Sequence, residues 1–365
     1  MNLLSEYAFF SNGKKRPKEE GIYPVYAGNG ILGYANDYNM ENGVIIGRVG
    51  AYCGSVYLEK GKCWVSDNAI KAETTERSNL VYLYYLLKGL HLNERQIGTS
   101  QPLLTQGILN NIDVSVPEIS VQNRIADILE SLDEKIHINT EINQNLEEQL
   151  STLFTSRFAD SITIASDATC PKLGDLVTII DNRGKTPPLT TECFEYPIID
   201  VGALKGQGRI IDFKNCSKYV EQNTYENWFR SGHPQPWDTL ISTVGSLAEM
   251  KLFLGTKGCM AQNVVALRPK LISPLYLYQY LRFIRSDLVA YNIGSVQPSI
   301  KVTHIIKHPI FIPDKNSLES FEETAKAITE QIYSNCNETE VLIRLRDTLL
   351  PKLMSGEIDV TDINV

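Results

Sequence analysis

One short pattern in this sequence has the spacing of a cofactor loop. Residues 28–33 read Gly-Asn-Gly-Ile-Leu-Gly, the Gly-x-Gly-x-x-Gly order that binds a dinucleotide or S-adenosylmethionine when a helix follows it. The N-terminal amides of that helix would receive the anionic groups of the ligand. The next residues, from Tyr34 to a Val-Ile-Ile run at 44–46, predict a strand instead of a helix. We therefore predict a turn-rich loop at residues 28–33.

A second pattern has the spacing of a metal site. His304 and His308 are four residues apart, as two zinc ligands on one helix face would be. Their surroundings predict extended chain, where this spacing separates the two rings, so we favour a structural or phosphate-facing role. The sequence has no phosphate-binding Gly-x-x-x-x-Gly-Lys-Ser/Thr loop and no His-Glu-x-x-His. Thr186-Pro-Pro-Leu189 differs from the Asn/Asp-Pro-Pro-aromatic tetrapeptide of an amino-methyltransferase site. We predict no catalytic residue and no metal ligand.

The remaining candidates suit contacts to DNA. Residues 14–18 hold four cations in five positions, which suits phosphates, although a solvated loop has the same composition. Glutamine can pair with adenine in the major groove. Gln101 and Gln297, however, stand in equivalent loops of the two halves, so they more simply brace the loop or touch the DNA backbone. The full candidate set is Lys14, Lys15, Arg16, Lys18, Asn29, Arg48, Tyr52, Gln101, Arg183, Lys185, Lys205, Arg209, Lys218, Ser246, Gln297 and Lys301.

The elements that must position these residues occur twice in the chain. Arg48-Val-Gly recurs as Thr243-Val-Gly, and Gly98-Thr-Ser-Gln-Pro recurs as Gly294-Ser-Val-Gln-Pro, at shifts of 195 and 196 residues. Each copy orders its parts as short β-like runs, a Tyr/Leu-rich helix, this loop and a strand that ends in proline. A constant shift of this size indicates two tandem domains rather than a solenoid. Base discrimination should lie where the copies differ.

The second copy also carries an insertion. About 22 additional residues lie between positions 199 and 238, and they are rich in Lys, Arg and aromatic side chains. Lys205, Arg209 and Lys218 belong to this segment. We expect it to face a DNA groove, with some of its aromatic residues in the core.

Each copy closes with a polar segment that carries a heptad seam. Apolar residues recur there in alternating steps of three and four, the a/d spacing of a coiled coil. The seams are Leu129, Leu132, Ile136, Asn139, Asn143, Leu146, Leu150 and Leu153 in the first copy, and Ala325, Ile328, Ile332, Asn335, Thr339, Leu342, Arg346 and Leu349 in the second. Two seams of equal length most simply pack on each other, although two unrelated surface helices are the alternative.

The polar layers of the seams constrain how they pair. An antiparallel pairing sets Asn143 against Asn335 and Asn139 against Thr339, while a parallel pairing in register also matches polar with polar, so the direction stays open. Buried amides at such layers fix the register at a cost in stability. A helix of about 38 residues rises about 57 Å. Such a rod is a spacer, and DNA half-sites at a fixed separation are a suitable target.

Composition excludes several classes of protein. Of the 365 residues, 43% are hydrophobic and 21% charged, typical of a soluble globular protein. No apolar run reaches the roughly 18 to 20 residues of a membrane helix, and the start lacks the pattern of a secretory signal. Seven cysteines with no Cys-x-x-Cys pair fit a reducing cytoplasm.

The net charge of −8 comes from residues 118–160 and 314–365, each at −6, while 1–117 is neutral and 161–313 is +4. The candidate DNA-reading segments are therefore not acidic.

Four motifs in this order resemble one family. They are the opening Tyr23-Pro-Val-Tyr-Ala-Gly-Asn-Gly30, the loop at 98–102, the segment from Pro117 to Ile136, and the closing Leu345-Arg-Asp-Thr-Leu-Leu-Pro-Lys-Leu-Met-Ser-Gly-Glu357. The chain resembles a specificity subunit of a type I restriction–modification system over essentially its whole length. The resemblance implies that each globular copy reads half of a bipartite site in double-stranded DNA. It also implies that the two helices pair antiparallel, set the spacer and dock two modification subunits, which restriction subunits join.

The resemblance further places catalysis and cofactors in other chains. S-adenosylmethionine, ATP and Mg are expected in the partner subunits, with none in this chain. The main alternative is a DNA methyltransferase or nuclease with built-in recognition domains, which would need the cofactor loop and the tetrapeptide that are missing. A protein–protein tether without a nucleic-acid role is a second alternative, which DNA binding by the assembled complex in a salt titration would distinguish.

The predicted fold is α/β (α+β), with two tandem target-recognition domains of mixed sheet and helices and two long helices that form an antiparallel coiled coil. The predicted parts are a first recognition domain at 1–117, a first spacer helix at 118–158, a linker at 159–171, a second recognition domain at 172–313, a second spacer helix at 314–356 and a tail at 357–365.

Overall fold

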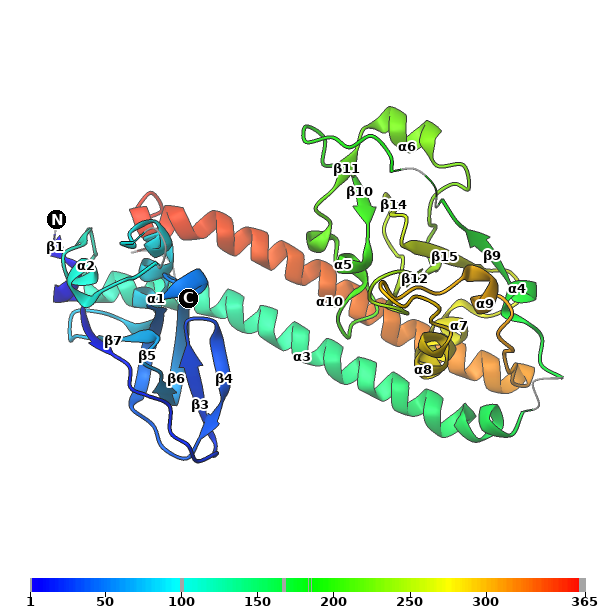
Figure 1. Cartoon of the computed structure of the whole chain (residues 1–365). Coiled ribbons are helices and arrows are strands. Elements are labelled where there is room, and N and C mark those ends of the chain that lie inside the picture. Colours follow the sequence, from blue (N-terminus) through cyan, green and yellow to red (C-terminus); the bar gives the residue numbers. More distant parts are fainter. Residues whose placement is uncertain (1, 99–101, 166–168, 183, 185, 361–365) are drawn as a thin grey trace. The chain divides into compact units, whose positions relative to one another are not determined.

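The computed structural model describes residues 2–98, 102–165, 169–182, 184 and 186–360. The chain forms two compact units, Met1–Ile136 with Val341–Val365, and His137–Glu340. Two long helices, α3 (Ile119–Ile164) and α10 (Lys315–Ser355), each contribute to both units (Figure 1). Residues 159–164 of the predicted linker are helical, because neither proline nor glycine interrupts α3 before Pro171.

The first unit is built on a six-stranded sheet in the order β2-β7-β5-β6-β3-β4, antiparallel except for β3 beside β6. Helix α1 packs on this sheet, where Leu83 and Leu87 join Val44 and Ile46 in the core. It begins where the Asn79 side chain accepts hydrogen bonds from two backbone amides. The elements are β1 (Asn2–Leu3), η1 (Leu4–Glu6), β2 (Ala8–Asn12), β3 (Tyr23–Ala27), β4 (Gly30–Ala35), β5 (Met40–Gly47), η2 (Gly50–Tyr52), β6 (Val56–Val65), β7 (Ala69–Thr74), α1 (Leu80–Gly89), η3 (Leu92–Glu94), α2 (Gln106–Asn110) and β8 (Asp113–Val114).

The second unit repeats this strand order in two pieces, β9-β15-β12-β13 and β14-β10-β11. Strands β13 and β14 together take the place of the single β6, and β10 lies parallel to β14 as β3 lies parallel to β6. The insertion replaces a short turn between the last two strands. The elements are α4 (Leu173–Leu176), β9 (Val177–Ile180), β10 (Tyr196–Ile199), α5 (Val201–Leu204), η4 (Phe213–Asn215), β11 (Tyr219–Val220), α6 (Gln222–Trp228), β12 (Thr239–Ser242), β13 (Met250–Leu252), β14 (Cys259–Met260), β15 (Val264–Pro269), α7 (Pro274–Phe283), α8 (Arg285–Ala290) and α9 (Val302–Ile305).

The glycine-rich pattern at 28–33 is a β-hairpin. Strand β3 ends at Ala27, residues 28 and 29 turn, and β4 starts at Gly30, whose φ of 93° suits glycine. No helix follows, as the sequence predicted. The predicted loop is shorter than expected, because Gly33 lies within β4 and pairs with Val25.

The histidine stretch differs from its prediction. His304 lies in the short helix α9 rather than in extended chain, because residues 302–308 form consecutive turns. His308 is buried, and its Nδ1 lies 2.9 Å from the hydroxyl oxygen of Tyr291. Within the described ranges, no three His, Cys, Asp or Glu side chains are grouped to hold a metal ion.

Helices α3 and α10 pair through the predicted seams. Every seam position is buried or half-buried, whereas most flanking positions are exposed. In the second unit Asn335 Nδ2 donates to Asn143 Oδ1 at 2.8 Å, and Asn139 Nδ2 lies 3.4 Å from Thr339 Oγ1. The higher-numbered residue of α3, Asn143, meets the lower-numbered residue of α10, Asn335, and Asn139 meets Thr339, so the helices are antiparallel. The same direction holds in the first unit, where Arg346 pairs with Asp133 at 2.7 Å.

We predict that the Asn143–Asn335 layer fixes the register. Asn143→Leu should lower the free energy of unfolding by about 1–3 kcal/mol, because it leaves the Asn335 amide buried without its partner. The Asn143→Leu/Asn335→Leu double variant should recover that loss, since leucine against leucine is a normal coiled-coil layer. Urea denaturation of the three proteins measures both effects. A double variant no more stable than the single one would contradict the prediction.

Candidate nucleic-acid interface

One set of backbone hydrogen bonds in the first unit gathers three loops at the end of β5. The amide of Arg48 donates to the carbonyl of Asn68 at 2.9 Å, and the amide of Gly50 donates to the carbonyl of Pro102 at 3.1 Å. The amide of Leu104 donates to the carbonyl of Arg48 at 2.9 Å. The end of the strand, the β6–β7 turn and the loop before α2 are therefore joined by backbone hydrogen bonds.

The second unit repeats this set bond for bond at the end of β12. Thr243 N donates to Asn263 O at 2.8 Å, Gly245 N to Pro298 O at 2.9 Å, and Ile300 N to Thr243 O at 2.8 Å. These positions follow the first set by 195 or 196 residues, so the duplication predicted from sequence is confirmed in three dimensions. Backbone bonds do not depend on side chains, and this scaffold can therefore carry different side chains in its two copies.

In the second unit the scaffold borders a cleft of about 630 Å³. It lies where β10, β12 and the turn before β15 end, and four DNA-contact candidates from distant parts of the sequence meet there. The lining is Thr186, Pro187, Leu189, Ile198, Asp200, Val201, Lys205, Lys218, Val244, Gly245, Ser246, Ala261, Gln262, Asn263 and Gln297. Lys205, Lys218 and Gln297 are exposed, and Ser246 is half-buried. The structure thus groups cations and amides around one opening, as contact with phosphates and base edges requires.

Two further cleft residues were missed by the sequence analysis. The Nε2 of Gln262 donates to the carbonyl of Gly184 at 3.1 Å and to Oγ1 of Thr186 at 3.2 Å. The Oδ1 of Asn263 is buried with no hydrogen-bond partner among the described residues. Gln262 occupies the position of Asp67 in the first copy, so a residue-by-residue alignment of the copies would have marked it as a site of difference.

In the first unit the chain segments that carry Asn29, Arg48 and Tyr52 lie side by side. The β3–β4 turn packs against the end of β5, where a Cβ added at Gly28 would lie 3.5 Å from Tyr52 Cβ. The hydroxyl of Tyr57 donates to the carbonyl of Gly28 at 3.1 Å and holds the turn in place. Asn29 and Tyr52 are exposed, and Arg48 Nε is buried without a hydrogen-bond partner in the described part of the chain.

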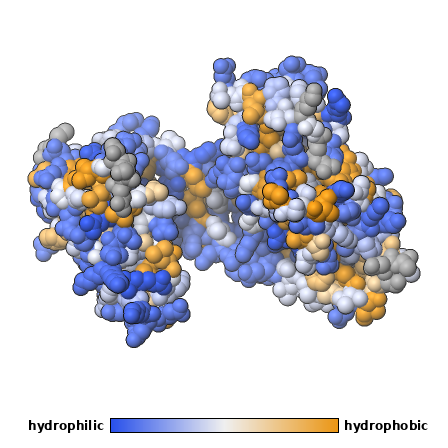
Figure 2. Space-filling view, in the orientation of Figure 1, coloured by the Kyte–Doolittle hydropathy of each residue, from blue (hydrophilic) through white to orange (hydrophobic). Residues whose placement is uncertain are grey.

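The basic segment at 14–18 crosses the same sheet. Lys14 forms a bridge with Ser66 after β6, and Arg16 Nη2 reaches the backbone of β4 at Gly33. Lys14, Lys15, Arg16 and Lys18 are all exposed, so they are available for phosphates. Figure 2 shows that the visible surface around the lower end of β3 and β4, as they are placed in Figure 1, is largely hydrophilic.

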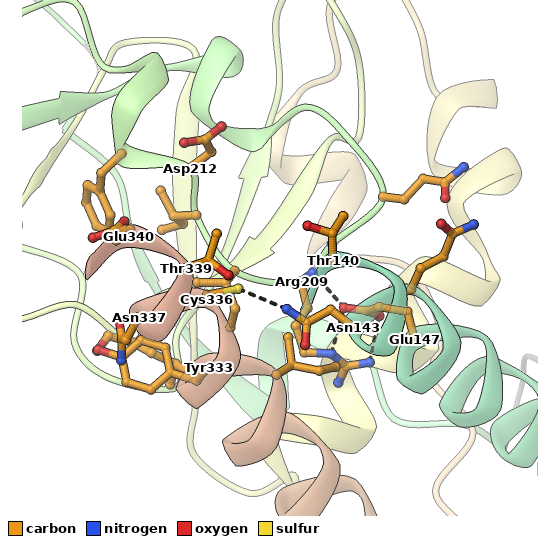
Figure 3. Close-up of a pocket in the computed structure, with 18 of the residues that line it drawn as sticks. Thr140, Asn143, Glu147, Arg209, Asp212, Tyr333, Cys336, Asn337, Thr339 and Glu340 are labelled. Atoms are coloured by element: carbon orange, nitrogen blue, oxygen red, sulfur yellow. Dashed lines mark hydrogen bonds and ion pairs between the residues drawn. The ribbon is translucent and has the colours of Figure 1, made fainter. Parts of the chain in front are cut away.

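The remaining candidates have separate outcomes. Lys301 is exposed just before α9, outside the residues that line the cleft. Gln101, Arg183 and Lys185 lie outside the described residues. The prediction for Arg209 was wrong, because its side chain is 1% exposed and is ion-paired to Glu147 on α3 with Nη2 2.8 Å from Oε2 (Figure 3). The insertion packs partly on the helices, and Arg209 cannot reach DNA from there.

Lys251 holds the insertion from the other side. Its buried ammonium donates to the carbonyl oxygens of Gly206, at 3.2 Å, and Gly208. Burial lowers the pKa of Lys251 from 10.5 to about 8, against the opposing effect of the Glu147 charge. The charged groups around it are Glu147, Arg282, Asp212 and Glu249.

The low pKa of Lys251 predicts a pH dependence of stability. Between pH 8 and 10.5 the unfolded chain retains the lysine proton that the folded chain has lost, so stability rises with pH in this window. The free energy of unfolding of the wild type should therefore rise relative to Lys251→Met as the pH is raised from 8 to 10. Urea denaturation at each pH measures this difference. For Lys270→Met, at an exposed lysine, the free energy of unfolding should change with pH as it does in the wild type. The same behaviour in Lys251→Met would contradict the prediction.

Comparisons with known proteins agree with this geometry. Residues 7–148 match the family described as "Type I restriction modification DNA specificity domain". The chain is 32% identical over 131 residues to the EcoprrI specificity subunit of Escherichia coli, covering 36% of this chain and 33% of that one. It is 23% identical over 304 residues to the MjaIX specificity subunit of Methanocaldococcus jannaschii, covering 77% of this chain and 70% of that one.

A solved structure extends the likeness in fold to nearly the whole chain. The type I restriction–modification S subunit of M. genitalium aligns with a TM-score of 0.62 at 17% identity, over 96% of this chain and 95% of that chain. The match to the EcoprrI subunit, in contrast, spans about a third of that relative. None of the described helices is both long and apolar enough to cross a membrane. These matches show that residues 7–148 carry a type I restriction–modification DNA specificity domain, and that the chain is similar over most of its length to type I specificity subunits.

Proposed function

We propose that this chain is the non-catalytic DNA-reading subunit of a type I restriction–modification complex, and that each unit reads one half of a bipartite site. The observation that carries the proposal is the shared scaffold. Identical backbone bonds present Arg48 in one unit and Thr243 in the other, and the surrounding side chains differ as well. Two readers with one frame and different contact residues suit two different half-sites.

The cleft of the second unit supports contact with DNA rather than with a small ligand. Lys205 and Lys218 flank it and remain exposed, which suits phosphates on either side of a groove. Asp200 is the one carboxylate among the lining residues, and its Oδ1 accepts a hydrogen bond at 2.8 Å from the amide of Gly202. The cleft therefore offers a net positive rim with amides between the cations.

Catalysis belongs to partner chains in this proposal. Two modification subunits dock on α3 and α10 and use S-adenosylmethionine, and restriction subunits bring the chemistry that needs ATP and Mg. The complex works in the cytoplasm, where its DNA substrate lies. The alternative of a self-sufficient methyltransferase finds no support in residues 28–33, which form a hairpin and not the start of a helix.

The test uses the chain assembled with its modification subunits. In host cells, methylated-base mapping with and without this gene should show one bipartite motif that disappears on deletion. Purified complex should bind a duplex with that motif, and the Lys205→Ala/Lys218→Ala variant should weaken binding at all salt concentrations and reduce the slope of log affinity against log salt by about 2. Lys270→Ala is the matched control outside the cleft.

Three outcomes would contradict the proposal. If deletion of the gene removes no motif, the chain does not direct methylation. If the chain alone transfers methyl groups from labelled S-adenosylmethionine to DNA, the self-sufficient methyltransferase is correct. A complex that binds no DNA at any salt concentration would favour the tether.

A further inference from the structure

A buried ion pair joins the insertion of the second unit to its two helices. Arg209 donates to Glu147 of α3 three times, from Nε at 2.9 Å, from Nη2 at 2.8 Å and from its own backbone amide at 2.7 Å. Its Nη1 donates to Oγ1 of Thr329 on α10 at 2.9 Å. One side chain thus contacts both helices, as Figure 3 shows for Glu147. Arg209 is 1%, Glu147 8% and Thr329 0% exposed.

The recognition domain reaches the same carboxylate by a second route. Arg282 of α7 donates from Nη1 to Glu147 Oε2 at 2.8 Å. The ring of Tyr278 lies beside both guanidinium groups, 5.5 Å from that of Arg209 and 5.7 Å from that of Arg282. Bidentate pairing of arginine with a carboxylate is directional, and burial penalises any geometry that leaves a charge unpaired. The cluster therefore permits one orientation of the domain on the helices.

The segment held by the Arg209–Glu147 ion pair, which we call the clamp, also contributes residues to the cleft. Arg209 lies four residues after Lys205 and nine before Lys218, which both line the opening. The carbonyl of Arg209 accepts a hydrogen bond from the amide of Leu252 at 2.7 Å, so the clamp connects directly to strand β13. A change in the Arg209–Glu147 contact would move the cleft relative to the helices.

The first unit has a different contact at the related place. There Tyr85 of α1 donates to Asp133 of α3, which also pairs with Arg346 of α10 at 2.7 Å. Asp133 precedes Thr329 by 196 residues, so the two contacts occupy equivalent positions in the duplicated chain. Among the described residues the Arg209 contact belongs to the second unit alone, because the insertion that carries Arg209 lies there.

We propose that Arg209 and Glu147 are positioning residues that fix the direction of the second cleft relative to the helix pair, and so determine how strictly the complex selects spacer length. The inference rests on the proposed function. One base pair of spacer changes the separation of two half-sites by about 3.4 Å and their rotation by about 35°. A rigid clamp rejects such a change, and a loosened one tolerates it.

The experiment measures spacer selectivity in the assembled complex. Duplexes carry both half-sites with the native spacer or with one base pair added or removed, and the readout is the ratio of affinities for native and altered spacers. The Glu147→Met/Arg209→Met variant removes both buried charges of the pair, while Arg282 loses its carboxylate but keeps a side chain that is 29% exposed to solvent. The ratio of affinities for this variant should fall about tenfold. Thr329→Val and Arg209→Lys keep more of the cluster and should lower the ratio of affinities by a smaller factor. These two variants keep the inference testable if the double variant does not fold.

The control is the exposed ion pair of the same domain. Glu195→Met/Lys257→Met removes a pair with side chains 54% and 44% exposed and should leave the ratio unchanged. If the clamp variants weaken binding to all three duplexes equally, the role is only structural and the inference is wrong. If the wild-type complex shows no preference for a bipartite sequence, the proposed function fails and the inference fails with it.

Discussion

Glu147→Ala is expected to lower the free energy of unfolding of the second unit by about 3–5 kcal/mol, because it leaves the Arg209 guanidinium buried without its carboxylate. Glu147 accepts hydrogen bonds from Arg209 and Arg282, and no other side-chain carboxylate bonds to Arg209 among the described residues. Chemical denaturation of the chain, followed by fluorescence and by far-ultraviolet circular dichroism, gives the value.

Two variants make this result interpretable. Glu148→Ala removes the neighbouring exposed carboxylate of α3 and should change the free energy by no more than about 0.5 kcal/mol. Glu147→Met/Arg209→Met should regain the part of the loss that comes from the unpaired Arg209, since a packed apolar pair replaces the buried ion pair at similar volume, whereas Arg282, 29% exposed, still lacks its carboxylate. A loss below about 1 kcal/mol for Glu147→Ala would mean that water reaches Arg209 in solution.

The second large effect is expected at Arg48. Its guanidinium forms no ion pair with any described residue, and its Nε is buried without a hydrogen-bond partner. Arginine in this state suits the two acceptors of guanine in the major groove. Arg48→Ala in the assembled complex should weaken binding to the cognate first half-site about 5- to 150-fold, which corresponds to about 1–3 kcal/mol, and should relax discrimination at one base pair.

The measurement is an affinity series over duplexes that vary each base pair of the first half-site. The control is Arg77→Ala, because Arg77 already pairs with Glu6 at 2.6 Å in the same unit. Equal weakening for every sequence, with a shallower salt dependence, would make Arg48 a phosphate contact and contradict base reading. Unchanged discrimination at the second half-site is expected in either case, because in the proposed function the other unit reads that half.

Local and periodic features of this protein followed from the sequence. The heptad steps predicted which faces of α3 and α10 are buried, and the antiparallel alternative already matched Asn143 with Asn335. Helix period is a property of consecutive residues, so a single segment is enough to reveal it. The absence of a helix after Gly33 was likewise evident from the β-like residues that follow.

Long-range contacts were not predictable in this way. The sequence placed Arg209 among the candidate DNA contacts. Its pairing with Glu147 was not predictable, because 62 residues separate the two and no local pattern links them. The convergence of Lys205, Ser246, Gln262 and Gln297 on one cleft also required the fold. Lys205, Ser246 and Gln297 were separate candidates in the sequence, with nothing to place them together, and Gln262 was not among the candidates.

The amino-acid sequence by itself determined that the chain is duplicated, that each copy ends in a helix with a buried seam, and that the seams have matching polar layers. Only the tertiary structure decided that the helices run antiparallel, that Arg209 serves the helix contact instead of DNA, and which loops form the cleft. The physical reason is distance along the chain. Periodicity and turn preferences act between neighbours, whereas burial and ion pairing depend on partners that only the folded chain brings together.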